Sequence, residues 1–468
     1  MTKAANGDID YTDKGLVEAA DKVAEWADKG YFGQGVTTVD ANTAGSMLMS
    51  GKAAIFYNGS WFTQNLTDDA QNPAGEDGIG FFNIPVADES ISSATSYSMN
   101  CGNILALDKG KYDEATAWFL KYFCENAPEY HIACAGSLLG IALAKPSSFP
   151  VGKVNFLQID PMTFSEFLLA NGDGNLLRFT ETIDQLEPIP DAFFKPLCEK
   201  LKMYYVTGGM PEAVLMWTRD RNVEAMQEVL SDIILAYERD FAKHPDSKEF
   251  PKISMIWRSL PSQLARENKK FIYRVVKEGA RAREYEDALQ WLVDARLVHK
   301  VYKSTAPGLP VAAYDDLSAF KIYLVDVGLL RRLARLAPTA FGEGDRLFVE
   351  FKGALTENFV LQTLMTQFEV PPRYWSQANP PYEVDFLIQR ENDIIPIEVK
   401  SEANTASRSM KKFKELFPNQ VKLRVRFSLN NLKLDDDVLN IPLFLADQAD
   451  RLIGLALRIR GQAGIESK

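Results

Sequence analysis

The sequence predicts an α/β protein of several domains, on the evidence of its length, its alternating helix-like and strand-like apolar patterns, and its uneven charge. At roughly 100 to 200 residues per domain, a chain of 468 residues predicts two to four domains. Hydrophobic residues make up 46% and charged residues 25%, which excludes a wholly disordered or collagen-like chain. We therefore expect more than one hydrophobic core.

Charge divides the chain into two parts. Residues 1–150 contain nine lysines, no arginine and 19 acidic residues, a net charge of −10, whereas residues 151–468 carry −1. All 22 arginines lie from Arg178 onward. This asymmetry predicts segments of different origin or with different partners, with a seam at Lys145–Pro150, where two prolines and two serines interrupt the pattern. Only the arginine-bearing part suits nucleic acid.

Several site classes are disfavoured by composition. The four cysteines form no CxxC pair, and the three histidines are far apart in sequence, which argues against a zinc ribbon, a disulfide scaffold and a histidine-activated nucleophile. No run of about 18 apolar residues predicts a membrane span. The first residues lack the pattern of a signal peptide, so we expect a cytoplasmic protein.

The first part of the chain predicts a small α/β lobe. Apolar spacing predicts helices over residues 15–30, 44–49 and 112–124 and strands over 53–57 and 79–85. The runs 49–61, 80–85 and 115–121 resemble the C-terminal part of a family 1 extracellular solute-binding protein of sugar ABC transporters. This resemblance implies a partial periplasmic-binding-protein-like lobe over residues 1–146 and a carbohydrate stacked on Trp61. The alternative is that Trp61 packs beneath the lobe.

The remainder resembles a second family. The runs 149–168, 205–214, 321–330, 383–388 and 396–401 resemble AAA-type ATPases that carry a C-terminal domain of unknown function. The resemblance implies an ATPase C-terminal remnant with a helical lid over residues 147–250, a winged-helix-like domain over 251–335, and a nuclease-like domain over 336–468. A lid without its partner would leave Phe156, Phe164 and Phe167 uncovered.

A phosphate-binding loop is not found. The closest string, Gly45–Lys52, has one residue too many between its glycines, and Ala53 stands where the magnesium-binding hydroxyl is needed. We therefore predict that the chain neither binds nor hydrolyses ATP.

Basic residues predict a DNA-binding surface in the winged-helix-like domain. Helices are predicted over residues 261–278 and 288–298. The basic residues around the first helix are Arg266, Lys269, Lys270, Arg274, Lys277, Arg281 and Arg283. Such residues neutralise DNA phosphates in helix-turn-helix proteins. A solvated helix face or an interdomain surface is the alternative.

The region after residue 350 contains the pattern best suited to catalysis. A helix over residues 355–368 carries Glu357, and strands follow at 373–375, 383–389 and 394–400. Since strand side chains alternate, Val384, Phe386 and Ile388 should share one face and Glu383 and Asp385 the other. In the next strand Glu398 and Lys400 point together. We expect the hairpin to gather Asp385, Glu398 and Lys400 on one side.

This spacing, Asp-x12-Glu-x-Lys, resembles the PD-(D/E)xK nuclease motif of restriction-endonuclease-like folds. The resemblance implies Glu357, Asp385, Glu398 and Lys400 as catalytic residues, with Asp385 and Glu398 as ligands of Mg²⁺ and Glu383 as an auxiliary carboxylate. The alternative is that these groups pair with one another without cutting anything.

The sequence thus predicts a truncated AAA-type ATPase-family protein with a nuclease-like, DNA-interacting domain, following half of a sugar-binding protein. Two alternatives stay open: a carbohydrate-binding component of an ABC transporter, and a chimera with no integrated function. The sequence does not determine the oligomeric state.

Overall fold

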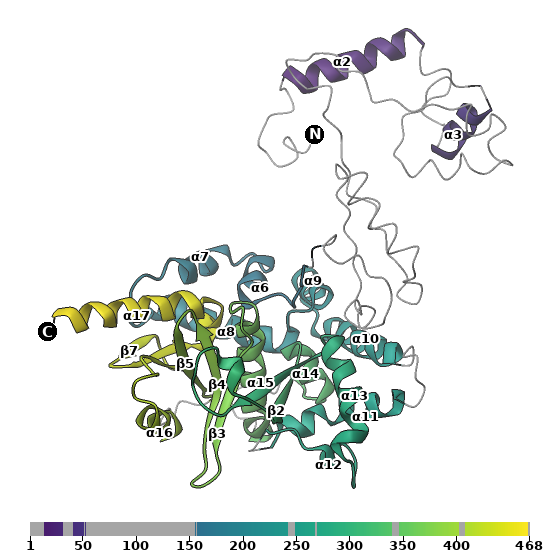
Figure 1. The fold of residues 1–468 in the computed structure, drawn as a ribbon. Coiled ribbons are helices and arrows are strands. Elements are labelled where there is room, and N and C mark those ends of the chain that lie inside the picture. The colour runs from purple at the N-terminus through teal and green to yellow at the C-terminus, as the bar shows by residue number, and fades with distance from the viewer. Residues whose placement is uncertain are drawn as a thin grey trace. The chain divides into compact units, whose positions relative to one another are not determined.

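The computed structural model describes residues 14–30, 41–50, 52, 155, 157–241, 249–266, 269–338, 346–401 and 408–466. The chain forms two compact units, Met1–Asn103 and Ile104–Lys468 (Figure 1). Over the described residues, the structure is a mixed α/β protein, as predicted. No described helix has the length and apolar character needed to cross a membrane.

The first unit contains two described helices, α2 (Lys14–Asp28) and α3 (Ala41–Met49), where the sequence predicts them. In α2, Glu25 binds Lys22 and Lys29 one turn to either side, an arrangement that favours an isolated helix. Trp61 and the predicted strands of this lobe lie outside the described residues.

The second unit begins with a group of helices. These are α6 (Phe164–Ala170), α7 (Gly174–Thr182), α8 (Asp191–Thr207), α9 (Pro211–Asp220) and α10 (Val223–Phe241). Thr163 and Glu166 form a reciprocal capping box that starts α6. Phe164 and Phe167 are buried, and both rings meet Tyr204 edge to face, so the expectation that they would be uncovered is wrong. Phe156 lies outside the described residues.

Three helices and a hairpin follow. They are α11 (Phe250–Leu264), α12 (Tyr273–Val276), α13 (Ala282–Asp294), β1 (Val298–Ser304) and β2 (Asp315–Leu324), with the 3-10 helix η5 (Val311–Tyr314) between the two strands. The single helix predicted over residues 261–278 is wrong, because α11 ends at Leu264 and only Tyr273–Val276 is helical in the described rest of that range. Lys270 pairs with Lys321 of β2 and the Phe271 amide donates to the Phe320 carbonyl, so the chain turns from helix to extended pairing there. The second predicted helix, over residues 288–298, corresponds to α13, which begins six residues earlier than predicted.

The last part supplies most of the sheet. It contains α14 (Val327–Leu333), α15 (Arg346–Met365), β3 (Arg373–Gln377), β4 (Tyr382–Arg390), β5 (Asp393–Val399), α16 (Arg408–Leu416), β6 (Arg424–Ser428), β7 (Lys433–Asp435), β8 (Val438–Pro442), the 3-10 helix η7 (Leu443–Gln448) and α17 (Ala449–Glu466). The three strands predicted after the helix match β3, β4 and β5 to within a few residues.

The described strands form a single mixed sheet in the order β2-β1-β3-β4-β5-β6-β8-β7. The strands β3, β4 and β5 are antiparallel neighbours, whereas β5, β6 and β8 run parallel. The hairpin β1–β2 joins this sheet because Lys303 of β1 pairs in parallel with Tyr374 of β3. Helix α15 packs on β2 and β5, and α16 packs on β4 and β5, so helices flank the sheet (Figure 1).

One buried carboxylate joins the start of α14 to the turn between α8 and α9. Asp326 caps α14 by accepting from the Leu329 amide at 2.8 Å, and its other oxygen accepts from the Gly209 amide at 2.7 Å. Gly208 has a φ of 72°, and a Cβ there would lie 2.3 Å from Asp326 Oδ1. Glycine is therefore needed at Gly208 for both conformation and space. A continuous hydrophobic core runs from Phe164 to Ala456, so the helical part, the hairpin and the main sheet fold together.

Candidate functional site

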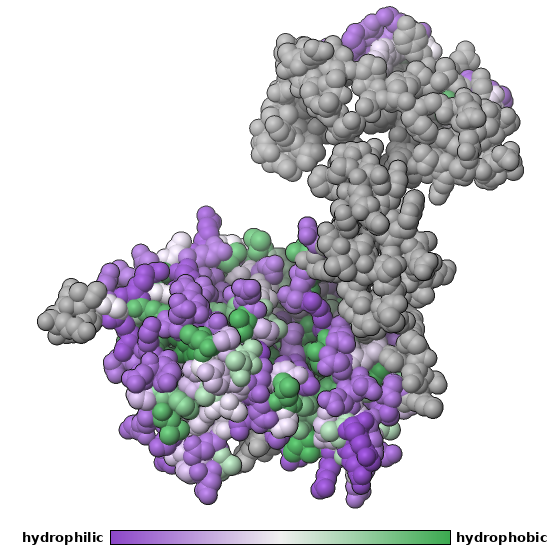
Figure 2. All heavy atoms as spheres, in the orientation of Figure 1, coloured by the Kyte–Doolittle hydropathy of each residue, from purple (hydrophilic) through white to green (hydrophobic). Residues whose placement is uncertain are grey.

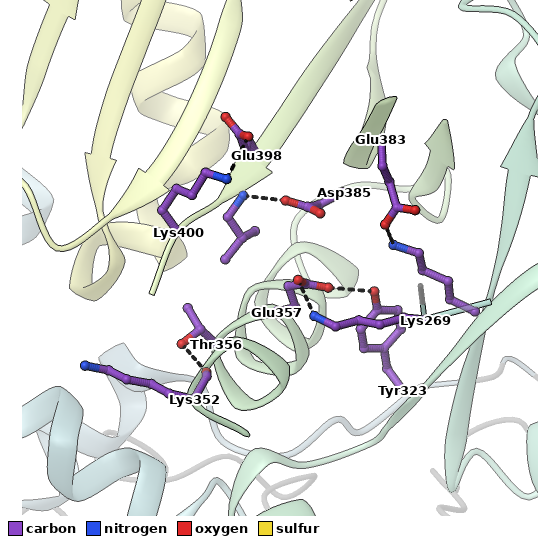
Figure 3. Close-up of polar contacts among 11 residues, drawn as sticks. Lys269, Tyr323, Lys352, Thr356, Glu357, Glu383, Asp385, Glu398 and Lys400 are labelled. Atoms are coloured by element: carbon purple, nitrogen blue, oxygen red, sulfur yellow. Dashed lines mark hydrogen bonds and ion pairs between the residues drawn. The ribbon is translucent and has the colours of Figure 1, made fainter. Parts of the chain in front are cut away.

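The carboxylate Glu357 projects from α15 toward the sheet and is held by two donors (Figure 3). Lys269 forms an ion pair with Glu357 Oε1, and the Tyr323 hydroxyl donates to Glu357 Oε2 at 3.2 Å. Burial favours the neutral form of Glu357, but the charges of Lys269 and Lys321 outweigh this, and its pKa is lowered. Glu357 is therefore a carboxylate whose negative charge is balanced by lysines from outside its own helix.

Asp385 lies beside this group because β4 contains a bulge. Arg373 of β3 pairs with Leu387 but Trp375 pairs with Val384, so β4 has one extra residue between these pairs. Val384 and Leu387 consequently both pack in the small core beside α16, while Phe386 packs in the main core. The predicted alternation of Val384, Phe386 and Ile388 on a single face is wrong, because a bulge reverses the facing of a strand.

The carboxyl group of Asp385 is largely removed from water and has one backbone donor. Its Oδ2 accepts from the Val399 amide of β5 at 2.8 Å. Burial raises the pKa of Asp385 to about 7, and the charge of Glu357 adds to this rise, while Lys321 opposes it. Asp385 therefore changes its charge near neutral pH.

Lys321 is the most deeply buried cation of the site. Its side chain is fully buried, forms an ion pair with Glu383, and lies 4.8 Å from the centre of the Tyr374 ring. Burial disfavours its charge, but Glu383, Glu357 and Asp385 outweigh this effect, so its pKa is raised. Burial and the Glu357 charge also raise the pKa of Tyr323 well above its ordinary value. Glu383, predicted as an auxiliary carboxylate, thus belongs to the same charged cluster.

The structure divides the predicted catalytic set into two groups. Glu357 and Asp385 share the cluster with Lys269, Lys321, Tyr323 and Glu383. Glu398 instead binds Lys400 at 3.0 Å. Its neighbours Ile397 and Val399 belong to the main core, so alternation turns the Glu398 side chain toward the other face, where it attracts Arg426. The expectation that the hairpin gathers Asp385, Glu398 and Lys400 on one side is therefore not met.

The carboxylates of the cluster are not arranged as ligands of a divalent metal. Among the described residues, no group of three or more His, Cys, Asp or Glu side chains is arranged to hold a metal ion. Both oxygens of Glu357 already accept from Lys269 and Tyr323, and one oxygen of Asp385 accepts from a backbone amide. Mg²⁺ prefers oxygen ligands without competing cations. The arrangement does not fit Mg²⁺, and the assignment of Asp385 and Glu398 as its ligands stays a prediction.

All but one of the predicted DNA-contacting residues are exposed. Arg266, Lys270, Arg274, Lys277, Arg281 and Arg283 are exposed. Lys269 is not, because it binds Glu357. Figure 2 shows strongly hydrophilic residues gathered around α12, the short helix within this segment.

Sequence reasoning missed the roles of Lys321 and Tyr323. A signal was present, since Lys321 stands inside the apolar strand Phe320–Leu324. A lysine in a buried strand needs a carboxylate partner.

Two buried atoms near Glu398, its own Oε2 and Arg426 Nε, have no hydrogen-bond partner within the described part of the chain.

Comparison with known families gives two matches. Residues 198–340 match the family described as Domain of unknown function (DUF8612), and residues 352–444 match Domain of unknown function (DUF4143). The second domain is typically found at the C-terminus of AAA-type ATPases, which agrees with the resemblance for that part of the chain. No curated protein and no solved structure matches the chain.

Proposed function

We propose that this chain is an accessory region of an AAA-type ATPase-family protein and that it contacts the DNA backbone through residues 266–283. The observation that carries the proposal is the set of six exposed basic side chains on a unit of three helices and a β-hairpin. The family match over residues 352–444 supports the ATPase-family part of the proposal.

The arrangement of this unit suits a winged helix. Helices α11, α12 and α13 precede the hairpin β1–β2, and the bridge between Lys270 and Lys321 adds a short third strand to it. In such units the third helix usually enters the major groove. Here the exposed face of α13 carries Glu284, Glu286 and Asp287, which would repel phosphates. We therefore assign the contact to the segment around α12 and expect binding with little sequence preference.

The domain after residue 346 suits a nuclease-like fold. Helix α15, the antiparallel strands β3, β4 and β5, helix α16 and the parallel strand β6 follow one another in the order of a PD-(D/E)xK core. Glu357, Asp385 and the Glu398-x-Lys400 pair follow one another along the chain in the order of this motif, but Glu398 and Lys400 pair with each other apart from the cluster that holds Glu357 and Asp385. Because Glu357 and Asp385 are engaged by other side chains and by backbone, we propose that the domain supports DNA contact without cleaving the strand.

Salt-dependent binding tests the DNA contact. Fluorescence anisotropy with a labelled duplex would compare the wild type with Arg274→Gln/Lys277→Gln across a salt series. Each lost phosphate contact lowers the slope of log affinity against log salt by about 0.9, so we expect a fall of about 1.8. The matched control is Lys195→Gln/Lys202→Gln, which removes two positive charges from the exposed face of α8. Equal slopes in the two variants would refute the proposed surface.

A further inference from the structure

The charged cluster between α15 and the sheet is built from two parts of the chain that are distant in sequence. Its carboxylates come from the domain after residue 346, here called the main domain: Glu357 lies on α15, and Glu383 and Asp385 lie on β4. Its cations come from the part that contains α11, α12, α13 and the hairpin β1–β2, here called the hairpin unit. In that unit Lys269 precedes the bridge to β2, and Lys321 lies within β2. In Figure 3 the Lys269 side chain ends beside the Glu357 carboxylate, on the same side as Tyr323.

The two ammonium groups stand where a cation is needed. Three carboxylates this close repel one another, and the burial of Glu357 strengthens the repulsion, so they require either bound cations or protons. Lys269 and Lys321 supply two positive charges, and each forms an ion pair with one carboxylate. One negative charge remains in excess when all groups are ionised, because three carboxylates face two ammonium groups.

We infer that Lys269 and Lys321 replace a divalent metal in this nuclease-like site. Their ion pairs with the carboxylates join the hairpin unit to the main domain and exclude the metal, an arrangement we call the lysine lock. The burial of the lysine side chains supports this role. The side chain of Lys321 is fully buried and the side chain of Lys269 is about 11% exposed, so neither lysine is a surface charge that happens to lie nearby. Removing one lysine leaves carboxylates with two excess negative charges, which is the condition for binding a divalent ion.

Metal titration of the full chain tests this lock. Calorimetry with MnCl₂ would compare the wild type with Lys269→Gln and Lys321→Met, and with Lys195→Gln as a control at an exposed lysine of α8 outside the cluster. We expect no saturable site in the wild type or the control, and one Mn²⁺ site, at least about tenfold tighter than any residual binding, in each lysine variant. The site should be lost again in Lys269→Gln/Asp385→Asn.

Two further variants make the outcome decisive. Lys269→Arg keeps the charge and should bind no metal; a gain there would overturn the inference, because shape and not charge would then be the cause. Folded Lys269→Gln and Lys321→Met proteins without a gain would also overturn it. If neither variant folds, the wild type decides: Mn²⁺ binding at pH 8 that Glu357→Gln abolishes would contradict the lock, and no binding would support it.

Discussion

Replacing Asp385 with asparagine should flatten the pH dependence of stability. The folded chain raises the pKa of this carboxyl from 3.8 to about 7, first through burial and then through the Glu357 charge. The folded state therefore holds a proton that the unfolded chain releases, and stability is lost as pH rises from about 4 to about 7. At about 1.4 kcal/mol per pKa unit, this group removes at most about 4 kcal/mol by pH 8. Asparagine has no such ionisation and still offers an oxygen to the Val399 amide.

Urea unfolding of the full chain at pH 5 and pH 8 measures this difference. We expect the wild type to lose more stability than Asp385→Asn between the two pH values, so that the variant is the more stable protein at pH 8. The control is Asp435→Asn, an exposed carboxylate on β7. If the wild type and Asp385→Asn lose the same amount, Asp385 is ionised throughout and the account of the cluster fails.

Three other outcomes follow from the structure. Gly208→Ala should destabilise the fold by about 2 kcal/mol or more, because its Cβ would meet Asp326, whereas Gly279→Ala, at a similar φ of 77° with no atom within 4 Å, should lose only about 1 kcal/mol in chemical denaturation. Phe167→Ala should lose about 3 to 5 kcal/mol, and a smaller loss would mean that α6 does not fold with the main core. Supercoiled plasmid with Mg²⁺ should stay intact with both the wild type and Lys400→Ala, and nicking by the wild type alone would show that the lysines do not block cleavage.

The strands of the candidate site are predictable because local pattern determines them. The apolar runs around Val384 and Ile397, with the polar turn Arg390–Asp393 between them, give β4 and β5 almost as expected. The direction of the side chains is not predictable in the same way. The bulge in β4 depends on how Trp375 packs against α16, and such packing leaves no local signal in β4 itself.

The helix over residues 261–278 failed for a related reason. Its apolar spacing suits a helix, but residues 270–271 pair with β2, about 50 residues later in the chain. Local propensity is weaker than a backbone ladder joined to a buried sheet. The same pairing carries Lys269 to Glu357, so the error in the helix and the missed role of Lys269 have one cause.

The contacts between the hairpin unit and the main domain limit where the chimera hypothesis can apply. Lys269 and Lys321 each find a carboxylate at least 62 residues away, and Asp326 binds a glycine amide 117 residues earlier. Isolated buried charges cost several kcal/mol each, so a joint between unrelated segments would not leave every one of these groups paired. The described parts of residues 157–466 therefore fold around one core, and the hypothesis of a fusion of unrelated segments concerns the seam at Lys145–Pro150.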